Sequence, residues 1–246
     1  MKQTSASGPG FNRFRKVQPK PVHLPQGELV TLEPLHPDNP LPLVIRPAVE
    51  DVDLAEWAGS HKELLEEKLL LHGAILFRGF KVRTAEEFER VAGSVTPDLV
   101  DDNGELPRTN ISGKIHAVSY APPEEAILWH NENSFCPGWP MKLWFYCHLP
   151  PKAGGETPVV DNRKLLERLD PDVRRAFEEK KIMYLRNFGR GLDFDWPVSF
   201  QTDDRKVVEA RCRESGTDFE WKPDGGLRTR SVRPAILEHP KTGEKV

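Results

Sequence analysis

The stretch that most constrains the fold is residues 127–161, in which apolar runs alternate with breaks rich in proline and glycine. Residues 139–147 are apolar and aromatic and have prolines close by, a pattern that predicts a buried strand. A tight turn at residues 150–155 and a short strand at 156–161 follow. We also predict residues 127–135 to be extended. Together these segments indicate a core rich in β-sheet.

Within this stretch, His130 and Glu132 place an imidazole and a carboxylate two residues apart. Side chains two positions apart on a strand point to the same face of the sheet. A 2-His-1-carboxylate iron site can take two of its three protein ligands from such a pair and leaves positions open for substrate and oxygen. A lone H-x-E triplet also arises by chance, so the alternative interpretation is an ordinary surface pair.

Further motifs lie on both sides of this pair, in a fixed order along the chain. They occupy residues 71–80, 107–114, 183–188, 196–202 and 219–227. Together with the pair, they resemble the Fe(II)/2-oxoglutarate-dependent oxygenases of the taurine dioxygenase (TauD/TfdA) family, from about residue 44 to the last residue. The chain is most similar to the clavaminate synthase-like branch, whose carboxylate ligand is glutamate, and to the syringomycin-cluster amino-acid hydroxylase type.

The resemblance implies a fold of the α+β class, with a double-stranded β-helix (jelly roll) core flanked by helices. It implies that His130 and Glu132 are iron ligands. It also implies that Thr157, which matches a family threonine, donates a hydrogen bond to the carboxylate of 2-oxoglutarate. The implied cofactors are Fe(II), 2-oxoglutarate as co-substrate, and O2. An ordinary strand threonine is the alternative interpretation of Thr157.

Two family residues have no counterpart in this sequence: the second histidine ligand and the arginine that pairs with 2-oxoglutarate. In the family both lie near the C-terminus, whereas residues 233–246 match a strand and turn that come earlier. His239 corresponds to a position in that turn and not to the ligand. We therefore expect a C-terminally truncated chain that lacks core strands, is marginally stable or prone to aggregation, and is inactive if truly truncated.

The organisation of the rest of the chain follows from composition and apolar spacing. Residues 1–42 are rich in Pro, Lys, Gly and Ser, which predicts an extended, flexible N-terminal arm. The oxygenase jelly-roll domain is then expected to span residues 43–246. A net charge of −3 predicts no basic surface, so nucleic acid is not an expected partner.

Compartment is inferred from apolar runs and cysteines. No apolar run is long enough to cross a bilayer, and residues 1–10 lack the apolar region of a signal peptide. The three cysteines are odd in number and lack C-x-x-C spacing, which favours reduced thiols over a disulfide framework or a zinc site. We therefore expect a cytoplasmic enzyme with no membrane association.

Three helices are predicted. Apolar spacing indicates a helix over residues 54–71. Thr84 followed by Glu87 gives the capping-box pattern of a second helix. Residues 161–180 predict a third, interrupted where Pro171 begins a new helix.

Several other residues have ordinary interpretations. His116 and His148 are interpreted as structural or surface residues and not as ligands. Gly154 and Gly155 suit a turn that needs positive φ. Arg186 either reaches the active site or braces the sheet, and the sequence supports both interpretations equally.

For the function, the resemblance implies a hydroxylase that acts on a small, amino-acid-like substrate. That substrate is either free or tethered to a carrier protein in natural-product biosynthesis. The alternatives are an oxygenase of a small organic acid or sulfonate, and a non-catalytic ligand-binding member of the fold. Because Glu132 fills the position that related halogenases leave for chloride, hydroxylation, desaturation or oxidative cyclisation is favoured over halogenation. The sequence leaves the substrate and the oligomeric state open.

Overall fold

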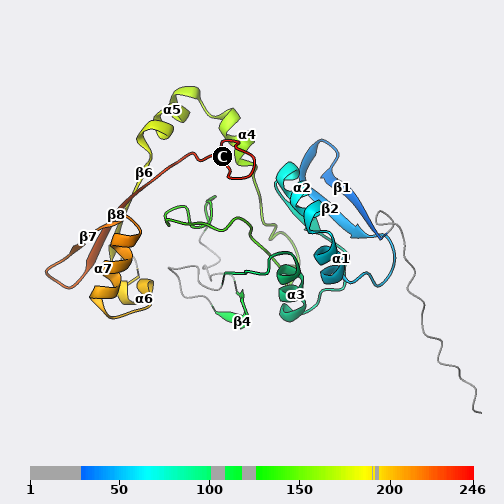
Figure 1. Cartoon of the computed structure of the whole chain (residues 1–246), viewed down its shortest axis with the longest axis horizontal. Coiled ribbons are helices and arrows are strands. Elements are labelled where there is room, and N and C mark those ends of the chain that lie inside the picture. The colour runs from blue at the N-terminus through cyan, green and yellow to red at the C-terminus, as the bar shows by residue number, and fades with distance from the viewer. Residues whose placement is uncertain (1–28, 101–108, 118–125, 190, 192–193) are drawn as a thin grey trace, which may run out of the picture.

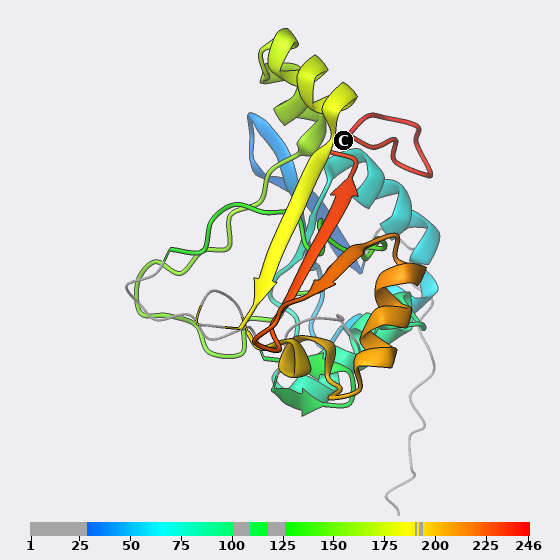
Figure 2. The same cartoon turned by 90° about the vertical axis from the view of Figure 1, so that its left-hand side faces the viewer.

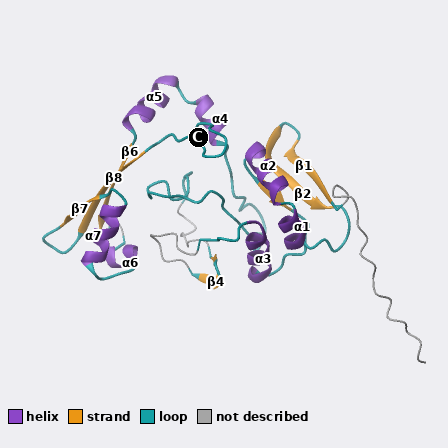
Figure 3. Ribbon diagram, in the orientation of Figure 1, coloured by secondary structure: helices purple, strands orange, loops and turns teal. Residues whose placement is uncertain are grey.

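The computed structural model describes residues 29–100, 109–117, 126–189, 191 and 194–246. The described residues form two packed units, one N-terminal and one C-terminal, drawn at opposite sides of Figure 1. Residues 126–161 run between the units without helix or strand, as the loop colour in Figure 3 shows. This irregular segment carries the His130–Glu132 pair, so the candidate site lies between the two units and is positioned by them.

The N-terminal unit is a three-stranded sheet packed against helices. β1 (Val30–His36) pairs antiparallel with β2 (Asn39–Pro47), and β2 pairs in parallel with β3 (Ile75–Phe77). Its helices are α1 (Leu54–Ser60), α2 (Lys62–His72) and α3 (Ala85–Val95). The core draws on the sheet and on all three helices, through buried apolar residues: Val30, Ile45, Leu54, Ala55, Trp57, Ala58, Leu65 and Val91.

The C-terminal unit is an antiparallel sheet in the order β6-β8-β7. Its strands are β6 (Ile182–Phe188), β7 (Asp218–Trp221) and β8 (Leu227–Arg233), and its helices are α6 (Trp196–Phe200) and α7 (Arg205–Glu214). Figure 2 shows β6 and β8 running side by side. A small core of Phe188, Val208, Cys212 and Leu227 joins this sheet to α7. Alternate residues of β8 are buried, so one face of the sheet is covered and the other is open.

Two smaller features accompany the two units. β4 (Asn110–Ser112) and β5 (Ile115–His116) form an antiparallel pair. Glu89 of α3 accepts a hydrogen bond from the backbone of Lys114 at 2.9 Å, which ties this pair to the N-terminal unit. The helices α4 (Asn162–Arg168) and α5 (Pro171–Lys180) lie between the two units, at the top of Figure 1.

The helix predictions are confirmed, with one refinement. The predicted helix over residues 54–71 is two helices, α1 and α2, which meet at His61. The capping box forms: the Glu87 amide donates to Thr84 Oγ1 at 3.2 Å, and the Thr84 amide donates to Glu87 Oε2 at 3.3 Å. The predicted interruption separates α4 from α5, which begins at Pro171. Local capping signals were enough to place these ends.

Among the described residues, regular secondary structure begins before residue 42, the predicted end of the N-terminal arm. Residues 30–42 form β1 and the first part of β2, whereas residues 1–28 of the predicted arm lie outside the described residues. Prolines favoured the arm interpretation. Among the described residues of this range, Pro34 lies on the edge strand β1, and Pro40 and Pro42 lie at the start of β2, before the part that pairs with β3, where a missing backbone donor costs little.

The strands predicted over residues 127–135, 139–147 and 156–161 are wrong: the structure has no strand in residues 126–161. The two-residue alternation is nevertheless present at residues 141–146. Trp144 and Tyr146 face α3 and its flanking loops, donating to Thr96 Oγ1 at 3.3 Å and to the Val82 carbonyl at 3.4 Å. A strand also needs a hydrogen-bonded neighbour, and among the described residues no other strand pairs with this segment.

The predicted jelly roll is likewise not closed among the described residues, which contain sheets of three, two and three strands. The class is a mixture of helix and sheet, as an α+β prediction requires. None of the helices in the described part of the chain is long and apolar enough to span a bilayer.

Candidate metal centre

His130 and Glu132 approach each other through the two atoms that a metal would need. His130 Nε2 lies 3.5 Å from Glu132 Oε2. His130 Nδ1 lies 2.7 Å from the carbonyl oxygen of Leu128. Because a carbonyl can only accept, Nδ1 carries the hydrogen in the neutral ring, which leaves the lone pair on Nε2. The ring orientation that metal-binding histidines require is therefore set by the backbone two residues earlier.

The local structure differs from the predicted strand. Residues 126–131 are irregular, and Glu132 begins two consecutive turns, which are closed by hydrogen bonds from the Ser134 amide to the Asn131 carbonyl at 3.3 Å and from the Cys136 amide to the Asn133 carbonyl at 2.9 Å. Asn133 adopts a φ of 57°, a left-handed conformation that asparagine tolerates better than most residues. The two side chains thus meet at the start of a turn and not across one face of a strand.

The donor set fits two neighbouring positions on one ion. Metal–nitrogen and metal–oxygen bonds of about 2.1 Å at a right angle would put the two donors roughly 3 Å apart, close to the spacing seen here. Among the described residues, no group of three or more His, Cys, Asp or Glu side chains converges on a point. A metal held by His130 and Glu132 would therefore need further ligands from outside the described His, Cys, Asp and Glu side chains. The pair alone would leave its other coordination positions open.

Thr157 is not part of this pair in the structure. It lies on the irregular segment after the glycine turn, is exposed, and forms no hydrogen bond to the described residues. The turn itself is confirmed: Gly154 has a φ of 68° and Gly155 a φ of 78°. A Cβ on Gly155 would lie 2.6 Å from the Cγ of Pro151, so the close approach also requires glycine there.

Arg186 lies against two aromatic rings on the side of the turn. Its guanidinium lies 4.5 Å from the ring centre of Phe188 and 5.5 Å from that of Phe135, which belongs to the turn after Glu132. These are cation–π distances. The contact with Phe135 joins β6 to the turn after Glu132, and the choice between the two interpretations of Arg186 stays a prediction.

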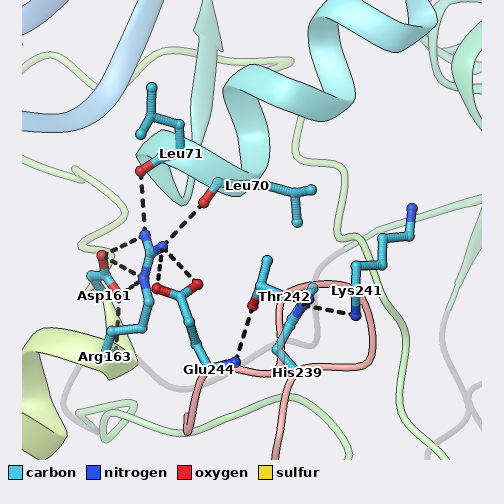
Figure 4. Close-up of polar contacts among 8 residues, drawn as sticks. All are labelled: Leu70, Leu71, Asp161, Arg163, His239, Lys241, Thr242 and Glu244. Atoms are coloured by element: carbon cyan, nitrogen blue, oxygen red, sulfur yellow. Dashed lines mark hydrogen bonds and ion pairs between the residues drawn. The ribbon is translucent and has the colours of Figure 1, made fainter.

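A hydrogen-bond network centred on Arg163 links the end of the irregular segment to distant parts of the chain. This network was not predicted from the sequence. Figure 4 shows its guanidinium between Asp161, Glu244 and the carbonyls of Leu70 and Leu71. The bonds to Asp161 measure 2.9–3.2 Å, that to Glu244 Oε2 measures 3.2 Å, and those to the two carbonyls measure 3.1 and 3.3 Å. Arg163 thereby joins α4, the end of α2 and the C-terminal turn.

A second ionic cluster lies nearby, on α2. Glu66 accepts from Lys142 of the irregular segment at 2.6 Å and also pairs with Lys241 of the C-terminal turn. Hydrogen bonds from Lys142, then from Lys241, hold the pKa of Glu66 below its ordinary value. Hydrogen bonds from Arg163 do the same to the pKa of Asp161.

These lowered pKa values predict a loss of stability in acid. A carboxylate with a lowered folded-state pKa stabilises the protein fully above its unfolded-state pKa, and this stabilisation is lost as the pH falls through the folded-state value. Urea unfolding from pH 7 downward should therefore show a decline beginning near about pH 4 to 5. Glu66→Gln should make that decline shallower, and an unchanged slope in this variant would contradict the role of Glu66.

An imidazole and a carboxylate oriented in this way are typical of non-haem metal centres that react with oxygen. Comparison with known proteins agrees. The family model described as "Taurine catabolism dioxygenase TauD, TfdA family" matches residues 32–246. The chain therefore belongs to the TauD/TfdA family, as its sequence motifs predicted.

Two relatives place the chain within the family. The dapdiamide synthesis protein DdaC of Enterobacter agglomerans is 32% identical over 212 residues, which cover 85% of this chain and 63% of that protein. A clavaminate synthase-like protein of Arabidopsis thaliana is 32% identical over 227 residues, which cover 85% of this chain and 69% of that protein. These similarities confirm the predicted clavaminate synthase-like branch. The chain spans less than two thirds of the length of DdaC, and the expected C-terminal truncation stays a prediction.

Proposed function

We propose that this protein is a non-haem Fe(II)/2-oxoglutarate-dependent dioxygenase that hydroxylates an amino acid or a carrier-tethered aminoacyl group. The observation that carries the proposal is the approach of His130 Nε2 to Glu132 Oε2, with Nδ1 held by the Leu128 carbonyl. Membership of a dioxygenase family supports the same chemistry. A relative that serves dapdiamide synthesis supports a substrate from natural-product biosynthesis.

In this proposal, the chain's own residues orient the reactants. His130 and Glu132 would hold the iron, and bound iron with 2-oxoglutarate would supply the oxidising chemistry. Thr157 would donate a hydrogen bond from its hydroxyl to the carboxylate of 2-oxoglutarate. Thr157 is exposed on the irregular segment, so its hydroxyl is accessible to such a ligand.

A second candidate substrate is a small sulfonate. The matching family model takes its name from a dioxygenase of taurine catabolism, and taurine is an amino sulfonate. The two candidates share the metal centre and differ only in the anionic group that the substrate pocket must bind.

The proposal is tested by an anaerobic titration with Fe(II) and 2-oxoglutarate, using protein expressed from its complete reading frame. A visible charge-transfer band that needs both Fe(II) and 2-oxoglutarate is the expected result. Succinate release on exposure to oxygen, with free amino acids, carrier-bound aminoacyl groups and taurine compared, then assigns the substrate class. The absence of a band at saturating Fe(II) would contradict the proposal and favour a non-catalytic ligand-binding protein.

A further inference from the structure

The turn that follows the metal pair is held from outside by three side chains. Asn162 at the start of α4 donates to Asn131 Oδ1 at 3.0 Å. The hydroxyl of Tyr184 on β6 donates to Ser134 Oγ at 3.2 Å. Arg233 at the end of β8 donates from Nε to the carbonyl oxygen of Phe135 at 3.1 Å. Three separate elements therefore fix the turn at its beginning, middle and end.

Arg233 differs from the other two because it holds the backbone of the turn and a second segment at once. Its Nη2 donates to the Ser215 carbonyl at 3.0 Å and to Thr217 Oγ1 at 3.2 Å, in the connection between α7 and β7. A planar guanidinium can serve acceptors on both sides because its donors form a rigid fork. Lysine has one flexible ammonium group and cannot reproduce this geometry.

The turn also receives apolar support on the same side. The ring of Phe135 meets that of Tyr184 edge-on, with centroids 6.2 Å apart. This contact fixes the side chain of Phe135, whereas Arg233 fixes its carbonyl. The direction of the turn, and with it the position from which the Glu132 side chain leaves the backbone, is thus set by β6 and β8.

We propose that Arg233 is a positioning residue for the metal centre: by holding the Phe135 carbonyl, it keeps the carboxylate of Glu132 in reach of His130 Nε2. This inference rests on the proposed function, since it assigns the pair to metal binding. Arg233 donates to the turn, to the connection between α7 and β7 and to the Val232 carbonyl, so its effect on the pair passes through the turn. Because Phe135 lies only three residues after Glu132, a shift of its carbonyl moves the carboxylate away from the imidazole.

Arg230 on the same strand offers a matched control. It points to the open face of the sheet and pairs with Asp218 at 2.7 Å, with more than half of its side chain exposed. Arg230→Gln removes a guanidinium from β8, as Arg233→Gln does, but leaves the turn untouched. A difference between the two variants therefore reports on the turn and not on the charge of the sheet.

The test combines Co(II) affinity, measured calorimetrically on protein from the complete reading frame, with hydrogen exchange of residues 131–136. Arg233→Gln should bind Co(II) about tenfold more weakly than wild type and exchange the Cys136 amide faster. Arg233→Lys should show the same defect, and Arg230→Gln should show neither. Tyr184→Phe, which keeps the ring and loses only the hydroxyl, should speed exchange in the turn with a smaller loss of affinity.

Two failures can be told apart. Wild type that binds Co(II) and an Arg233→Gln variant that binds it equally well would overturn the positioning role alone. An equal loss in Arg230→Gln would also overturn it, since the effect would then belong to the sheet. Wild type that binds no metal would overturn the proposed function, and with it any role of Arg233 toward a metal.

Discussion

Replacing Arg163 by methionine is expected to lower the free energy of unfolding by about 3 kcal/mol. The change leaves the Asp161 carboxylate, which is only 11% exposed, without its cation. It also leaves the carbonyls of Leu70 and Leu71 unpaired at the end of α2, where a helix has no internal donors to offer. Because Arg163 itself is partly exposed, the loss should lie at the lower end of the range for buried ion pairs.

Urea unfolding of the two proteins at pH 7 measures this difference. Arg175→Met is the matched control, because Arg175 pairs with Asp172 within one exposed helix and its loss should cost no more than about 0.5 kcal/mol. Equal stability of the Arg163 and Arg175 variants would show that the Arg163 network adds no more stability than an exposed ion pair within one helix.

The parts of the fold that the sequence predicted are those with local signals. Thr84 and Glu87 are three residues apart and cap α3 by themselves, and Asp170 with Pro171 does the same for α5. The glycine turn was predictable for a similar reason, because positive φ excludes most other residues. α7 was not predicted, although Asp204 caps its start by accepting a hydrogen bond of 2.8 Å from the Lys206 amide.

The contacts that shape the candidate site are distant in sequence and carry no local signal. Arg163 reaches Leu71 across 92 residues, and Arg233 reaches Phe135 across 98. The strands predicted in residues 126–161 failed for a related reason. Alternation of apolar residues shows which side of an extended segment can be buried, but a ladder depends on a neighbouring strand that the segment does not encode.

Replacing His130 by alanine is expected to weaken metal binding more than about 100-fold, because the variant loses one of the two donors that the chain is seen to offer. The same substitution should leave the free energy of unfolding within about 0.5 kcal/mol of wild type. More than half of the His130 side chain is exposed, and its hydrogen bond is to the Leu128 carbonyl two residues away, so it joins no distant elements. Substitution of His130 should therefore change metal affinity and leave the free energy of unfolding nearly unchanged.

The prediction is checked by anaerobic Fe(II) titration and urea unfolding of the same samples. His148→Ala is the control, since His148 is also exposed and lies outside the pair. Undiminished Fe(II) binding in His130→Ala would show that the metal is held elsewhere. A loss of stability comparable to that of Arg163→Met would show that His130 supports the fold. The Arg163 network joins distant segments, so we expect Arg163→Met to lower the free energy of unfolding. His130 faces Glu132 at the solvent, so we expect His130→Ala to weaken metal binding instead.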